Sequence, residues 1–180
     1  EEVANFRKQI VDHVVPIVTK LHEQKKEILG LDELYFYDGI NFKDGDPKPK
    51  GTPDELVKSA QEMYHELSPE TGEFFDTMVN EELMDLVNRD GKRPGGFCTS
   101  FPKYDRPYIF SNFNGTDHDI TVLTHEAGHA FQNYSSTHLP LVNYHWPTME
   151  AAEIHSMSME FFTWPWMKKF FKEDTEKFKY

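Results

Sequence analysis

The residues most able to do chemistry in this chain form the run His-Glu-Ala-Gly-His at positions 125–129. His125 and His129 are four residues apart, so on an α-helix both imidazoles lie on one face and can bind the same metal ion. Glu126, beside the first histidine, can take a proton from a metal-bound water. The pattern is typical of zinc peptidases, and it requires a helix over these residues.

A catalytic zinc site usually has three protein ligands and one water, so a third ligand must lie elsewhere. In metzincins it is a histidine six residues after the motif, but this chain has Ser135 there, and Gln132 where that family needs glycine. Glu153 is the candidate that fits, because a helix hairpin would bring the following helix beside the two rings. Glu150 is the main rival. Two histidines and a glutamate are a known ligand set of zinc peptidases.

The length and composition predict one acidic domain. The chain has 180 residues and a formal net charge of -12, with 19 Lys and Arg against 31 Asp and Glu. This charge repels phosphate backbones and anionic headgroups, so we expect neither nucleic acid nor membrane as a partner. Cys98 is the single cysteine, which excludes an internal disulfide and favours a reducing compartment, the cytoplasm.

Residues 1–90 are expected to be a helical portion. Apolar side chains at three- and four-residue steps predict a long helix over 3–28, with a kink at Pro16. The aromatic stretch 34–38 is either a strand or a packed loop. The composition of 43–53, rich in Lys, Asp, Gly and Pro, favours an exposed connection inside one domain rather than a domain boundary.

Two further helices in this portion are predicted from their starts. Thr52-Pro53 and Ser68-Pro69 each place a capping side chain before a proline that suits the first turn of a helix. The first of these helices is expected to end at about Leu67. The second carries apolar residues as far as Val87 and is expected to end near Asp90.

Residues 91–116 are expected to form a small sheet. Two aromatic, roughly alternating runs, 95–101 and 106–113, are joined by a short turn and predict two strands. The second strand directly precedes the HEAGH helix. We expect it to be an edge strand that holds an extended peptide by main-chain hydrogen bonds. The residues expected to bind substrate in this way are Ser111, Asn112, Phe113 and Asn114.

Residues 117–180 are expected to be the zinc-binding helices. After Pro147, a stripe at helical spacing is expected to face inward, although it contains three acids. Burying a carboxylate costs several kcal/mol unless a cation or donor compensates, and a metal with its histidines would do so. The stripe consists of Glu150, Glu153, Met157, Glu160 and Trp164. Three other histidines are expected to have packing or capping roles: His118, His145 and His155.

Several motifs together resemble the thimet oligopeptidase and oligoendopeptidase F family of zinc peptidases, in particular the branch with the Pz-peptidases. They are the HEAGH run, an E-x-x-S-x-x-x-E pattern from Glu153 to Glu160, the run GKRPGGFC at 91–98, and FSNFNG at 110–115. The resemblance implies a mainly α fold with a small β-sheet, built as a zincin-type catalytic core. It also implies that Glu153 is the third zinc ligand and that Glu160 orients a ligand histidine.

The resemblance further implies a zinc metalloendopeptidase that cleaves oligopeptides with one Zn²⁺ per chain. Glu126 would be the general base and then the general acid. Family members carry further helical segments that grip the substrate and stabilise the oxyanion. We therefore expect this chain to be a fragment of a longer helical protein, with the remaining segments as its partners. The alternative is a catalytically incomplete zinc-binding fragment, or a non-enzymatic module that needs a partner segment.

Overall fold

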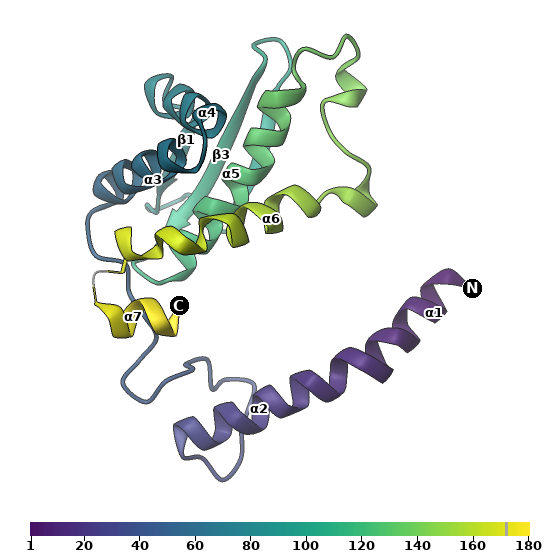
Figure 1. Ribbon diagram of the computed structural model, residues 1–180, viewed down its shortest axis with the longest axis vertical. Coiled ribbons are helices and arrows are strands. Elements are labelled where there is room, and N and C mark those ends of the chain that lie inside the picture. Colours follow the sequence, from purple (N-terminus) through teal and green to yellow (C-terminus); the bar gives the residue numbers. More distant parts are fainter. Residues whose placement is uncertain (172) are drawn as a thin grey trace. The chain divides into compact units, whose positions relative to one another are not determined.

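The computed structural model describes residues 1–171 and 173–180. The chain forms two compact units, Glu1–Asp46 and Pro47–Tyr180 (Figure 1). This boundary falls inside the stretch 43–53, so the interpretation of that stretch as a connection within one domain is wrong. The reason is that residues 1–46 contact mainly one another. Among the described residues, no helix is both long enough and apolar enough to cross a membrane.

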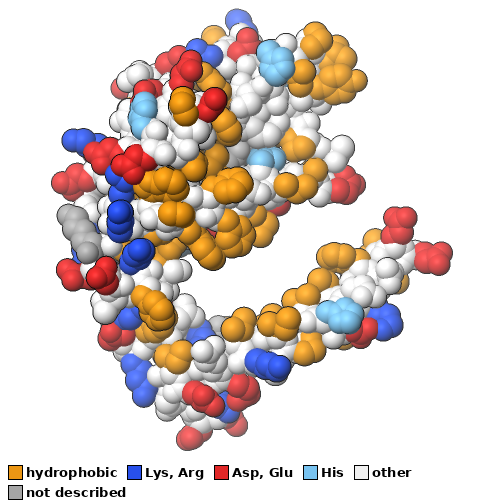
Figure 2. Space-filling model, viewed as in Figure 1, with side chains coloured by type: hydrophobic (Ala, Val, Ile, Leu, Met, Phe, Trp, Pro, Cys, Tyr) orange, Lys and Arg blue, Asp and Glu red, His pale blue; other side chains and the backbone are white. Residues whose placement is uncertain are grey.

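The first unit contains the predicted N-terminal helix. It consists of α1 (Glu2–Gln9), a π-helical turn (Ile10–Val14) and α2 (Val15–Leu29), and Gly30 ends it in the left-handed conformation. The irregular turn ends two residues before Pro16, which has no N–H to continue the α-helical hydrogen bonds. The apolar side chains along this helix are exposed (Figure 2). Residues 34–38 form a loop with a turn at Phe36 and Tyr37 and contain no strand.

The second unit begins with α3 (Pro53–Leu67) and α4 (Pro69–Asn80), and both predicted starts are confirmed. Thr52 and Glu55 form a reciprocal capping box at α3. At α4, the Ser68 hydroxyl accepts a hydrogen bond from the backbone N–H of Thr71. These caps satisfy backbone donors that a helix start otherwise leaves unpaired.

The predicted end of α4 near Asp90 is wrong. The helix ends at Asn80, Glu82 turns the chain with a φ of 56°, and Met84–Val87 form strand β1. Residues 1–90 are therefore not wholly helical. The apolar run up to Val87 fits either a helix or a strand, and pairing with a later strand decides between them.

The sheet has three strands: β1, β2 (Phe97–Phe101) and β3 (Arg106–Phe113). The predicted pair β2 and β3 is antiparallel, whereas β1 pairs in parallel with β3, which gives the order β1-β3-β2. Because β3 lies in the centre, the expectation that it is an edge strand is wrong. β2 is the edge strand on the side away from β1.

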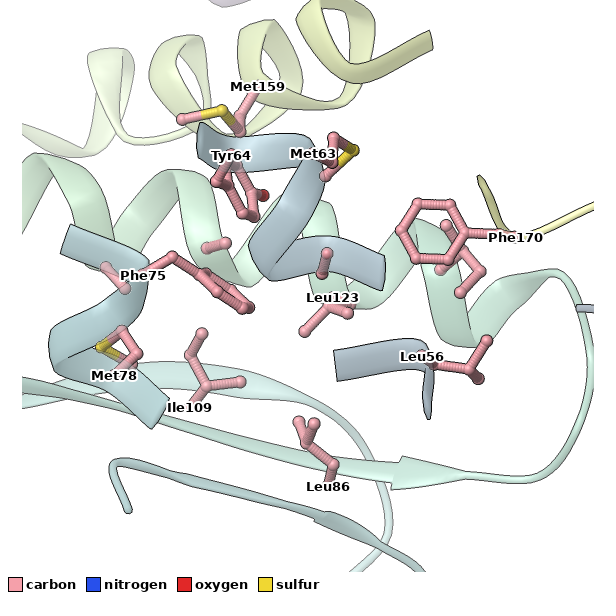
Figure 3. Packing of buried hydrophobic residues seen from close by; sticks show 14 of the residues in the cluster. Leu56, Met63, Tyr64, Phe75, Met78, Leu86, Ile109, Leu123, Met159 and Phe170 are labelled. Atoms are coloured by element: carbon pink, nitrogen blue, oxygen red, sulfur yellow. The ribbon is translucent and has the colours of Figure 1, made fainter. Parts of the chain in front are cut away.

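The C-terminal part is helical, as predicted. It contains α5 (His118–Ser136), α6 (Ile154–Thr163) and α7 (Asp174–Lys179), with short 3₁₀ turns between α5 and α6 and after α6. Helix α5 packs against β2, β3 and α6. The core lies between the helices and one face of the sheet (Figure 3). Its fully buried members include Met63, Tyr64, Phe74, Phe75, Ile109, Ile120, Leu123 and Phe170.

The prediction that the stripe from Glu150 to Trp164 faces the core is wrong. Met157 and Trp164 are 51% and 53% exposed, and the buried side chains are those of Ser156, Met159 and Thr163. The α-helix starts only at Ile154, after a 3₁₀ turn, so an α-helical spacing counted from Pro147 does not apply. Two members of the stripe, Glu153 and Glu160, nevertheless face α5.

Candidate active site

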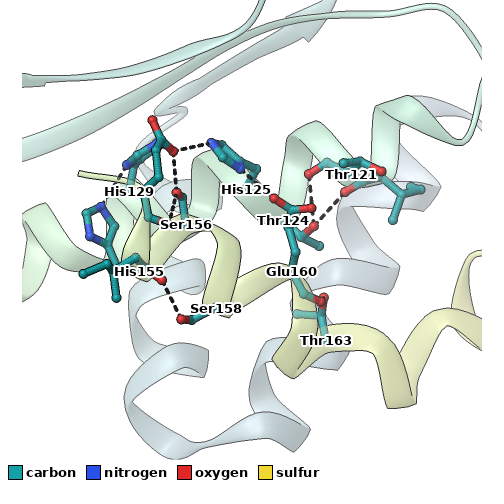
Figure 4. A network of polar contacts seen from close by, with 12 residues as sticks. Thr121, Thr124, His125, His129, His155, Ser156, Ser158, Glu160 and Thr163 are labelled. Carbon is teal, nitrogen blue, oxygen red and sulfur yellow. Dashed lines mark hydrogen bonds and ion pairs between the residues drawn. The ribbon is translucent and has the colours of Figure 1, made fainter. Parts of the chain in front are cut away.

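Helices α5 and α6 bring two histidines and a carboxylate together (Figure 4). The Nε2 atoms of His125 and His129 lie 3.1 and 3.3 Å from the same oxygen, Oε2 of Glu153. The three donor atoms are all within 4.8 Å of one another. Among the described residues, these three form the group of His, Cys, Asp and Glu able to hold a metal ion. The rival Glu150 is exposed and lies outside this group.

The close approach of the two helices depends on Gly128. A Cβ atom at this position would lie 2.7 Å from the Cα of Ser156 and 2.9 Å from the carbonyl oxygen of His155. Only a residue without a side chain allows the two backbones to come this close. The contact point is one residue from His129 in α5 and three from Glu153, so it positions the metal donors directly.

Ser156 holds the carboxylate of Glu153 in place. Its hydroxyl donates to Oε2 of Glu153 at 2.7 Å. This hydrogen bond is the main reason why the pKa of Glu153 lies below its usual value, with the two histidines adding to the effect. The carboxylate is therefore kept ionised, the form that binds a metal ion.

Each histidine of the donor group has a partner for its second ring nitrogen. Nδ1 of His125 lies 2.7 Å from Oε1 of Glu160, which is the place that the resemblance implies for this acid. Nδ1 of His129 lies 2.8 Å from Nε2 of His155. Burial lowers the pKa of both His129 and His155, which favours neutral rings.

His155 was expected to have a packing or capping role, and its contact with His129 was missed. The sequence places it beside Glu153 but does not give the rotation of α6 against α5. The other two histidines have no part in this group: His145 is buried with Nε2 3.0 Å from the carbonyl oxygen of Leu139, and His118 is exposed.

Glu126 lines the same cavity as His125, His129 and Glu153. It is only 8% exposed, and burial raises the pKa of its carboxyl. A raised pKa suits a group that must accept a proton and later return it. Burial also raises the pKa of Cys98 to about 12, so that thiol stays protonated at neutral pH.

A cavity of about 350 Å³ lies in front of these groups. Its walls are His125, Glu126, His129 and Glu153 on one side and Gly96, Phe97, Cys98 and Trp146 on the other. The indole N–H of Trp146 donates to the hydroxyl of Ser100, which ties the segment before α6 to β2. Strand β2 therefore forms one wall of the site.

The residues expected to bind substrate on β3 do not line this cavity. Ser111 and Phe113 are buried, and the amide of Asn112 donates to the carbonyls of Arg93 and Gly95. Asn114 donates its backbone N–H to the carboxylate of Asp119 instead. Two residues of β2, Phe97 and Cys98, line the cavity instead, because β2 and not β3 lies at the edge of the sheet.

The donor set fits a zinc ion. Ligands at 2.0–2.1 Å around a tetrahedral ion lie about 3.3–3.4 Å apart, and the distances of 3.1 and 3.3 Å from Glu153 to the histidines agree with this. Two imidazole nitrogens and one carboxylate oxygen are ordinary zinc ligands that leave one position open. Glu126 and the three donors line the same cavity.

Comparison with known proteins gives consistent matches. Residues 1–180 match the peptidase family M3. The chain is 29% identical over 182 residues to an oligoendopeptidase F homolog of Borreliella burgdorferi, covering 96% of this chain and 29% of that protein. It is 26% identical to the group B oligopeptidase PepB of Streptococcus agalactiae, covering 99% of this chain and 29% of that protein.

A solved structure of PZ peptidase A with an inhibitor superposes on this chain with a TM-score of 0.94 and 58% sequence identity. The match covers 98% of this chain and 32% of that one. The chain thus spans about a third or less of the length of the proteins that it matches.

Proposed function

The chain belongs to peptidase family M3, and on this basis we propose that it is the zinc-binding part of a metalloendopeptidase that hydrolyses oligopeptides. The observation that carries the proposal is the donor group of His125, His129 and Glu153, with Glu126 beside it at the cavity. The oligopeptidase names of the relatives support the substrate class.

A zinc ion held by the three donors would polarise the scissile carbonyl and make a water molecule more acidic. Glu126 would take the proton of the attacking water and deliver it to the leaving amine. Its burial in the wall of the cavity would hold the carboxylate in position between these two transfers. Glu160 would keep His125 in the tautomer that presents Nε2 to the metal.

The substrate would lie along β2. Among the described residues, this strand pairs only with β3, so its other edge would offer main-chain donors and acceptors to an extended peptide. Phe97 and Cys98 on β2 and Trp146 opposite line the cavity next to the metal donors. Main-chain pairing is largely independent of side-chain identity, which suits an enzyme that accepts varied oligopeptides.

The second candidate is an incomplete zinc-binding part that needs the remaining segments of a longer protein. One observation favours it: Phe161 and Phe162 on α6, and Trp164 directly after it, are more than half exposed. Large apolar side chains grouped on a surface mark a place where another segment packs. Under either candidate, we propose that the protein works in a reducing compartment, as its single cysteine suggests.

The test is cleavage of an internally quenched oligopeptide by the zinc-loaded chain. We expect Glu126→Gln to bind zinc as the wild type does but to lose a factor of about 10² to 10⁴ in cleavage, and a chelator to abolish cleavage. Glu150→Gln is the matched control, because that exposed acid lies outside the donor group. Full activity in Glu126→Gln would refute the mechanism. One bound zinc without cleavage would favour the second candidate.

A further inference from the structure

The contact between His129 and His155 has a defined geometry. Nδ1 of His129 and Nε2 of His155 are 2.8 Å apart, and the two rings meet edge to face with their centroids 4.9 Å apart and an angle of 76° between the planes. Figure 4 shows the two side chains reaching toward each other from α5 and α6. Two ring nitrogens at this distance share one hydrogen, so one is the donor and the other the acceptor.

The direction of this hydrogen bond follows from the other nitrogen of His129. Its Nε2 faces Oε2 of Glu153 at 3.3 Å, within the donor group, and must keep a free lone pair to bind a metal ion. The hydrogen of His129 is then on Nδ1, which donates to Nε2 of His155. His155 must therefore be neutral and carry its own hydrogen on Nδ1.

We propose that His155 is a positioning residue that fixes the tautomer and ring orientation of the ligand His129. This inference rests on the zinc site of the proposed function. The backbone of His155 has little freedom to move, because its carbonyl oxygen lies at the tight contact with Gly128. The backbone of residue 155 therefore cannot shift along α5 without breaking the helix contact.

The two ligand histidines have different partners, and the difference has an electrostatic consequence. His125 donates to a carboxylate, that of Glu160, whereas His129 donates to a neutral ring. Glu126, Glu153 and Glu160 already place three acids around an ion of charge +2. A fourth acid at position 155 would make the group more negative and weaken the ion's pull on a water or carbonyl. A neutral acceptor orients His129 without adding charge.

The experiment measures zinc affinity of the full chain by competition with a chromophoric chelator, together with the visible absorption of the Co²⁺-loaded chain. In His155→Phe the ring keeps its bulk but loses the acceptor, and we expect zinc affinity to fall about 10- to 100-fold with an altered Co²⁺ spectrum. In His155→Gln the side-chain oxygen can accept from Nδ1, and we expect most of the affinity and the wild-type spectrum to return. His138→Phe is the matched control, because His138 is exposed at the end of α5.

Wild-type affinity in His155→Phe would overturn the inference, since the acceptor would then be dispensable. An equal loss in the Phe and Gln variants would overturn it as well, because the hydrogen bond would not be the cause. Failure of the wild-type chain to bind zinc would instead remove the proposed function and this inference with it. Thermal unfolding of the metal-free variants shows whether a loss of affinity is a loss of folding.

Discussion

Replacing Gly128 by alanine sets two opposing effects against each other. In the interior of a helix, alanine is favoured over glycine by about 1 kcal/mol, so the change would stabilise an isolated α5. In the folded chain the new Cβ would lie 2.7 Å from the Cα of Ser156 and 2.9 Å from the carbonyl oxygen of His155, whereas ordinary contacts are 3.4–4 Å. Backbone atoms cannot rotate away, so α6 must move by roughly 0.7 Å.

The clash is expected to exceed the gain in helix propensity. Extra atoms in a closely packed contact typically cost about 1–3 kcal/mol, so the net loss in the free energy of unfolding reaches up to about 2 kcal/mol. The effect on zinc binding is expected to be more severe than the effect on stability. Glu153 moves with α6, and metal–ligand distances tolerate only about 0.2 Å. We expect zinc affinity to fall by at least about tenfold.

Urea unfolding of the metal-free chain and competition with a zinc chelator measure the two effects separately. Gly39→Ala is the control, because a Cβ at Gly39 would meet nothing within 4 Å and its backbone needs no positive φ. The reasoning would be refuted by a Gly128→Ala chain that is about 1 kcal/mol more stable than the wild type and binds zinc equally well. That result would mean that the helices separate at no cost.

Two other changes test the surroundings of the site and the sheet. Glu160→Gln removes the charged acceptor of His125, and a chelator competition should show zinc affinity lowered about 10-fold with little change in unfolding; unchanged affinity would contradict the role of Glu160. Asp85→Ala removes the partner of Arg89 and of the buried Lys92, and urea unfolding should show a loss of about 1–3 kcal/mol. The hydrogen bonds from Arg89 hold the pKa of Asp85 well below its usual range. The contribution of Asp85 to the free energy of unfolding is therefore present above about pH 4 and is lost as the pH falls further. The unfolding free energies of wild type and variant should then become equal in acid. A difference that stays constant with pH would contradict this.

Features fixed by neighbouring residues could be predicted from the sequence. The starts of α3 and α4 follow from the side chains of Thr52 and Ser68, which bond to backbone within one helical turn. The placement of His125 and His129 on one face of α5 follows from helical geometry alone. The position of Glu153 beside these histidines could be predicted because the resemblance supplied a sequence pattern. The spacing alone had left Glu150 as a rival.

Features fixed by contacts between distant segments could not be predicted. Strand β1 exists because it pairs with β3, whose residues come more than 20 positions later, and the same pairing makes β3 central. The contact of His155 with His129 depends on the rotation of α6, which the close approach at Gly128 restricts. The division at Asp46 likewise depends on where contacts are made rather than on local composition.

The segment that leads from β1 into β2 is fastened at two points. The side chain of Lys92, only 2% exposed, donates to the carbonyl of Val87 at the end of β1, and the amide of Asn112 donates to the carbonyl of Gly95 just before β2. The wall of the cavity is therefore already in place before any peptide arrives. If a peptide binds along this edge, as proposed above, most of the ordering entropy would be lost by the peptide, because the protein would offer a preformed template.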